Sequence, residues 1–298
     1  MASLEQLIKE KSKRLNDIPL ELQNAVIKQQ KEVLNEITLL LNDLDVKDGQ
    51  FVISKQNIKT IEKINDDLKK VFLNDEYLKS VKEFAKEFDA QAELNNKVIK
   101  AGLGEIETPA ASLLYIETAK RGSVAALLNA SEFTAPVYSI LETAVINGAS
   151  LKETINNIRT FAEGNDKVDS KVLSYVKQIS NDSFAVADRS YTSIISDYLG
   201  NDWFYYSGGE IDTTRCFCDE RVGKYFHYKE IESWGRGENL GDCNIGGGRW
   251  GGMIAGTNES TIYSYLGGYN CMHSLIPVSE AIVSDSDKER AKKLGYID

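Results

Sequence analysis

The chain contains no cysteine and no histidine before Cys216, and only four cysteines and two histidines in 298 residues. This absence excludes disulfide bonds and soft metal ligands from the N-terminal two thirds, so any such site is local to the C-terminal third. Proline is equally scarce, with four residues in all. Few interruptions of helices are therefore expected.

Long apolar runs, blocks of basic residues and a secretory signal are also missing. No run of about 18 apolar residues occurs, so we expect no membrane-spanning helix. The start of the chain lacks a basic stretch followed by an apolar one, which predicts that the thiols meet a reducing cytosol first. The formal net charge of −10 argues against general electrostatic binding to DNA or anionic membranes.

Residues 1 to about 200 have the apolar periodicity of helices. One stripe predicts a helix from just after Pro19 to the break at Asp48-Gly49, and two more follow over residues 58–72 and 77–88. Thr108-Pro109 and Ser150, which precedes Glu153 at capping-box spacing, indicate helix starts. Residues 169–199 predict a last long helix that ends at Gly200.

The composition changes after Gly200. Residues 203–206 and 224–228 are aromatic and favour strands, and Ile211 to Thr214 could pair back as a hairpin. Residues 235–256 contain nine glycines, a density that predicts a loop. We therefore expect an α+β chain with a helical arm or bundle (1–105), a second helical part (106–200), a small glycine-rich module with strands (201–284) and a charged tail (285–298).

The cysteines and histidines of this module suggest a metal site. Cys216 and Cys218 form one pair, and Cys271 and His273 form another. In an extended chain residues i and i+2 point to the same side, so the two pairs could make a closed Cys₃His site, for which structural zinc is the usual metal. Cys243 and His227 are spare candidates. The alternatives are unligated thiols packed as small hydrophobes, or a disulfide formed in an oxidising setting.

Two other kinds of site, a nucleophilic Cys/His pair and a phosphate-binding loop, have weaker support than the metal site. Cys271 and His273 are too close in sequence to face each other as a nucleophile and its base. The glycine-rich stretch lacks the Gly-Lys-Ser/Thr ending of a phosphate-binding loop. No small-molecule substrate is evident, and the sequence predicts a protein that is not an enzyme.

The C-terminal part resembles the head morphogenesis family of tailed-phage minor head proteins, which is related to the phage Mu F protein. The resemblance covers about residues 130–280. It rests on an aromatic strand and glycine turn, and on a terminal Asn-Cys-x-His where the family often has a second Cys. The matching residues are Thr214, Arg215, Cys218, Gly223, Lys224, Asn270, Cys271 and His273.

The resemblance implies a low-copy virion protein of a phage or prophage, made in the bacterial cytoplasm. Such a protein would act with the portal or other capsid proteins, and with packaged DNA, in head assembly or DNA delivery. Two alternatives stay open: an enzyme or injected effector built on the Cys/His module, and a zinc-dependent nucleic-acid-binding module. In the second, Trp203, Tyr205, Tyr206, Trp234 and Trp250 would stack on bases.

Overall fold

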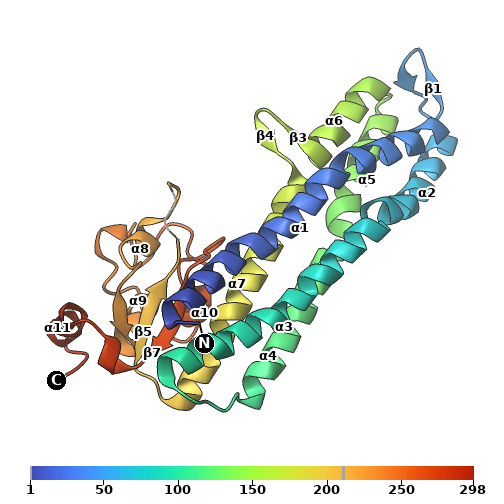
Figure 1. Ribbon diagram of the computed structural model, residues 1–298. Coiled ribbons are helices and arrows are strands. Elements are labelled where there is room, and N and C mark those ends of the chain that lie inside the picture. Colours follow the sequence, from blue (N-terminus) through green and yellow to red (C-terminus); the bar gives the residue numbers. More distant parts are fainter. Residues whose placement is uncertain (1, 210–211) are drawn as a thin grey trace. The chain divides into compact units, whose positions relative to one another are not determined.

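A computed structural model describes residues 2–209 and 212–298 (Figure 1). It confirms a mainly helical α+β chain. The chain forms two compact units: unit 1 comprises Met1–Pro19, Lys86–Gly122 and Ser180–Asp298, and unit 2 comprises Leu20–Ala85 and Ser123–Ile179. Each unit is assembled from separate stretches of chain. The division at residues 105, 200 and 284 expected from composition stays a prediction.

Seven long helices account for most of the chain. They are α1 (Leu4–Leu40), α2 (Lys55–Phe72), α3 (Asp75–Leu103), α4 (Ala110–Leu127), α5 (Ser131–Ile146), α6 (Leu151–Glu163) and α7 (Lys171–Leu199). The predicted start after Pro19 is wrong, because α1 begins at Leu4 and contains this proline. A proline inside a helix removes one hydrogen bond, but Leu15, Ile18 and Leu22 are buried on both sides of it. Burial of this stripe offsets the loss.

Unit 2 has an aromatic centre and two short hairpins. The Phe133 ring lies 5.5 Å from Phe72, 6.2 Å from Tyr77 and 5.5 Å from Tyr175. The predicted break at Asp48-Gly49 is the turn between β1 (Val46–Lys47) and β2 (Gln50–Phe51), which Figure 1 shows where α1 leads into α2. The second hairpin, β3 (Gly164–Asn165) with β4 (Val168–Asp169), was not predicted.

The capping prediction for α6 is confirmed, because Ser150 Oγ accepts a hydrogen bond from the backbone N–H of Glu153 (3.4 Å). Ser54 caps α2 in the same way through Asn57. Each hydroxyl satisfies one of the backbone donors that a helix start leaves free.

Unit 1 holds a three-stranded antiparallel sheet in the order β6-β5-β7. Its strands are β5 (Trp203–Ser207), β6 (Tyr225–His227) and β7 (Ser274–Val278). Both aromatic strands are thus confirmed. The expected hairpin partner is not: Ile211 lies outside the described residues, Asp212 to Thr214 form no strand, and β5 pairs with β6 and β7 instead.

Short helices and loops complete this module. They are α8 (Cys216–Asp219), α9 (Tyr228–Gly235), η2 (Gly241–Cys243), α10 (Ile262–Tyr265), η3 (Glu280–Ile282) and α11 (Asp285–Lys293). The glycine-rich stretch is a loop, as predicted, and Trp250 anchors it by stacking on Phe217 with 4.2 Å between ring centroids. The charged tail contains helix α11, which Ser284 caps, and Arg290 of this helix pairs with Glu230 (3.2 Å).

One segment, Ala110–Ile146, is long and apolar enough by composition to cross a membrane. It spans α4, the turn after Leu127 and α5, and 28% of its most apolar window is buried. Core helices of water-soluble proteins meet the same criterion. The expectation that no helix spans a membrane therefore stays a prediction.

Candidate metal centre

Three of the four predicted ligands converge in the core of unit 1. Cys218 Sγ lies 3.7 Å from Cys271 Sγ, which lies 3.7 Å from His273 Nδ1. All three residues are buried, and one ligand atom from each falls within 4.8 Å of the other two. They come from α8 and from the segment that leads into β7, which are 53 residues apart. The two ends of the module therefore meet at one point, as predicted, through these three residues.

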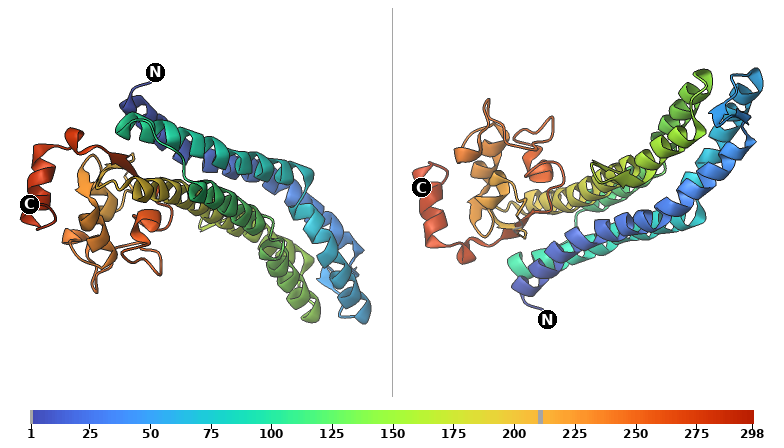
Figure 2. Two further views of the ribbon diagram at one scale, coloured as in Figure 1. Left: turned by 90° about the horizontal axis from the view of Figure 1, so that it is seen from below. Right: turned by 90° about the horizontal axis from the view of Figure 1, so that it is seen from above.

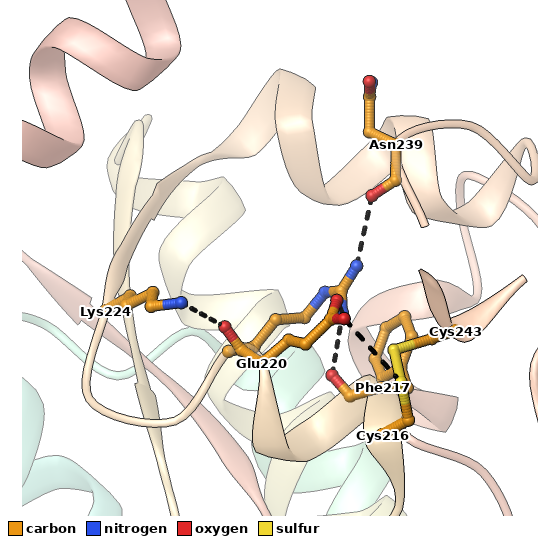
Figure 3. The surroundings of a disulfide bond; sticks show 7 residues. Cys216, Phe217, Glu220, Lys224, Asn239 and Cys243 are labelled. Atoms are coloured by element: carbon orange, nitrogen blue, oxygen red, sulfur yellow. Dashed lines mark hydrogen bonds and ion pairs between the residues drawn. A yellow bond between two sulfur atoms is a disulfide. The ribbon is translucent and has the colours of Figure 1, made fainter. Parts of the chain in front are cut away.

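Cys216 is the exception and corrects the four-ligand set. It forms a disulfide with Cys243, one of the spare candidates. The prediction assumed an extended chain, but Cys216 and Cys218 lie in the helical turn α8. Residues i and i+2 of a helix are about 200° apart around its axis, so the two sulfurs diverge. Figure 3 shows the disulfide with Glu220 beside it.

The electrostatics favour a thiolate at Cys271. Hydrogen bonding from the Cys218 thiol lowers the pKa of Cys271 well below its usual value, and His273 and Arg189 add to this effect. The same interaction, with burial, raises the pKa of Cys218. Tyr206 Oη lies 3.3 Å from Cys218 Sγ and is kept protonated, because burial raises its pKa well above the usual value. Cys218 and Cys271 thus share one negative charge, which lies on Cys271. A thiolate is the form of cysteine that binds metals.

Helix α7 positions the segment that carries Cys271 and His273. Arg189 Nη1 donates to the backbone carbonyls of Cys271 (2.8 Å) and His273 (3.1 Å). Asp182 accepts from the N–H of Asn270 (2.6 Å), and Asp188 accepts from the hydroxyl of Ser274 (2.7 Å). These charge-assisted bonds hold the segment that carries both ligands against α7. Sequence reasoning missed all three α7 residues, because nothing local relates them to a segment more than 80 residues away.

Two glycines form the walls of the site. A Cβ atom at Gly267 would overlap the sulfurs of Cys218 and Cys271, and one at Gly208 would overlap the His273 ring. The backbone therefore approaches the three side chains more closely than any other residue type allows. His273 Nε2 is buried and has no hydrogen-bond partner among the described residues.

The remaining family-motif residues lie around this centre. Gly223 and Lys224 form the turn between α8 and β6, where the Lys224 ammonium donates to the Glu220 carbonyl (2.5 Å) (Figure 3). Asn270 adopts a left-handed conformation (φ 55°) directly before Cys271. Thr214 and Arg215 precede α8, and His227, the other spare candidate, caps α9 and is not part of the group.

Two sulfurs and one imidazole nitrogen form a soft donor set. Such donors select zinc or copper(I) over calcium or magnesium. Among the described residues no further Cys, His, Asp or Glu joins the group. The geometry therefore offers three protein ligands, one fewer than the closed site that the sequence predicted.

Comparisons with known proteins add no relative, because no family model, curated protein or solved structure matches this chain.

Proposed function

We propose that this protein is a minor head protein of a tailed phage or prophage, a low-copy component that acts with the portal in head assembly or DNA delivery. The observation that carries the proposal is the meeting of Cys218, Cys271 and His273 in one buried cluster. These residues belong to the two ends of the pattern that resembles the head morphogenesis family. The shared site of the two distant ends of this pattern supports the resemblance.

We further propose that the cluster binds zinc and that the metal has a structural role. Zinc would join α8 to the segment before β7 and so hold a module that has little regular structure. Three protein ligands leave one coordination position open, as in catalytic zinc sites. We nevertheless favour a structural role, because all three ligands are buried and a substrate would need access. The Cys/His module as an enzyme or injected effector is the less favoured alternative.

The nucleic-acid alternative loses its main support. Of the five aromatic residues proposed to stack on bases, Trp203, Tyr206, Trp234 and Trp250 are buried in the cores of unit 1. Only Tyr205 keeps part of its surface exposed. Base stacking needs an open ring face, so these rings serve packing instead.

The test of the head-protein proposal is incorporation into particles. The chain is co-expressed with the portal and major capsid proteins of the same phage or prophage, and the procapsids are isolated on a density gradient. We expect it in the procapsid fraction at low copy number, and absent when the portal is omitted. A chain that stays at the top of the gradient in both cases would refute the proposal.

Elemental mass spectrometry on protein purified without chelator tests the metal proposal. We expect about one zinc ion per chain. Zinc should be lost in Cys271→Ser and in Cys218→Ser but retained in Cys243→Ser, which removes only the disulfide. Zinc that depends on Cys243 would contradict the three-ligand assignment, and a wild-type protein without metal would refute zinc binding.

A further inference from the structure

A buried polar cluster in unit 1 lies where α1, α3 and α7 meet. Lys11 Nζ lies 2.5 Å from Asn95 Oδ1, 2.8 Å from Asp188 Oδ1 and 3.4 Å from Thr192 Oγ1. Lys11, Asn95 and Asp188 are each no more than 1% exposed. Figure 2 shows from two sides that the N-terminal part of α1 runs beside the C-terminal part of α3, which carry Lys11 and Asn95.

The proton of Lys11 is held less tightly than that of an exposed lysine. Burial lowers the pKa of Lys11, although Asp188 opposes the shift. Burial alone would raise the pKa of Asp188, but the charge of Lys11 and hydrogen bonds from Lys11, Gln91 and Ser274 lower it overall. Asp188 is therefore a carboxylate that can accept a proton from Lys11 when the amine attacks. A neutral lysine amine is a nucleophile, whereas the ammonium is not.

The amide carbon of Asn95 is within reach of this amine. Since a C=O bond is about 1.23 Å long, a nitrogen 2.5 Å from Oδ1 lies within about 3.7 Å of Cγ. Reacting atoms in a near-attack arrangement are about 3–3.5 Å apart. Three packed helices hold the two groups at nearly this distance, so little motion is needed.

Asp188 contacts both the attacking and the leaving nitrogen. Its Oδ1 lies 2.8 Å from Lys11 Nζ and 2.9 Å from Asn95 Nδ2. Gln91 donates to the same oxygen (2.9 Å), and Ser274 donates to Oδ2 (2.7 Å), so the carboxylate is held in place. A carboxylate between two nitrogens can accept a proton from one and deliver it to the other, as general acid–base catalysis requires.

From this geometry we propose that Lys11 and Asn95 form an intramolecular isopeptide bond, with Asp188 as the proton shuttle. Nζ attacks Cγ, the Cγ–Nδ2 bond breaks, and a Cγ–Nζ amide forms. The two protons that leave Nζ pass through Asp188 to Nδ2, which departs as ammonium. Atoms and charge balance without an oxidant or a co-reactant. The bond links α1 to α3 covalently, independently of the function proposed above.

Intact mass spectrometry of the reduced wild-type protein reads the bond directly. We expect a mass lower than the sequence requires by one molecule of ammonia. A tryptic digest should contain a branched species that joins residues 10–13 to residues 87–97, because trypsin does not cleave after an acylated Lys11. The proposal is overturned if, after several days at neutral pH, the protein still has the full mass that the sequence requires and the two peptides are found separately.

Variants identify the chemistry once the bond is seen. Asp188→Asn keeps the size and most hydrogen bonds but cannot shuttle protons, and Lys11→Arg removes the amine; both should show the full sequence mass. Lys9→Arg is the matched control, since Lys9 pairs with Glu5 at the surface, and it should retain the loss of ammonia. A bond that persists in Asp188→Asn would overturn the assigned role of Asp188.

Discussion

Arg189 donates from a single guanidinium nitrogen to the carbonyl of Cys271 at 2.8 Å, and the same nitrogen reaches the carbonyl two residues further on. The metal ligands are therefore positioned through their backbone by a residue that binds no metal itself. Arg189 is 2% exposed, so its bonds form in an environment where an unpaired carbonyl is costly.

Replacing Arg189 tests this arrangement. Arg189→Met should lower the free energy of unfolding by about 3 kcal/mol, because buried carbonyls lose a charged donor. Urea denaturation followed by circular dichroism measures the change. Arg236→Met is the control, since Arg236 pairs with Glu238 and Glu259 on the surface and should cost less than about 1 kcal/mol. Equal costs for both variants would contradict a structural role for Arg189.

A methyl group at Gly267 should disrupt the centre by steric overlap. Gly267→Ala places a Cβ atom on the sulfurs of Cys218 and Cys271, so we expect loss of zinc and a lower melting temperature. Gly251→Ala is the matched control, because a Cβ atom there meets nothing within 4 Å. Elemental analysis and thermal denaturation of both variants distinguish the outcomes. Retention of zinc in Gly267→Ala would show that the ligands are arranged differently.

The disulfide between Cys216 and Cys243 should protect the glycine-rich loop. It closes a loop of 27 residues in sequence, for which the loss of chain entropy predicts a stabilisation of about 3.5 kcal/mol. Cys243→Ser should therefore speed proteolysis within residues 235–256, and a reducing agent should have the same effect on the wild-type protein. The variant itself should not respond to the reductant. If it still does, another group is being reduced.

His227 predicts a pH dependence of stability. Burial lowers its pKa below the usual value of about 6.5, and its Nδ1 must be unprotonated to accept from the Lys229 N–H (3.4 Å). Between the lowered pKa and about 6.5 the unfolded state binds more protons. Stability therefore falls as the pH decreases through this window, by at most about 1.4 kcal/mol per pH unit.

The comparison of wild-type protein with His227→Asn isolates this contribution. Asparagine still offers a capping oxygen to α9 but does not titrate. Urea denaturation between pH 5 and 8 should give a smaller loss of stability on acidification for the variant. Identical pH profiles for the two proteins would assign the dependence to other groups.

Helices could be predicted from the sequence where one apolar stripe repeats over several turns, as it does in α2 and α7. The start of α1 could not, because proline marks a helix start more often than it lies inside one. Strand β7 was not predicted, since all five of its residues are buried and it shows no alternation.

The candidate centre was predictable in its composition but not in its connectivity. The positions of Cys218, Cys271 and His273 indicated the meeting of two distant pairs. Cys216 was misplaced, because four residues are too few for periodicity to distinguish a helical turn from an extended chain. Its pairing with Cys243 depends on how the loop folds, which spacing alone does not determine.

The division of unit 1 into three stretches of chain has a consequence for synthesis. Unit 2 ends at Ile179, so all of its residues are made before the last and longest stretch of unit 1 begins. Lys11, by contrast, is made 177 residues before Asp188. Domains fold as their residues emerge. Lys11, in the first turns of α1, therefore has no Asp188 to pair with until nearly two thirds of the chain has left the ribosome.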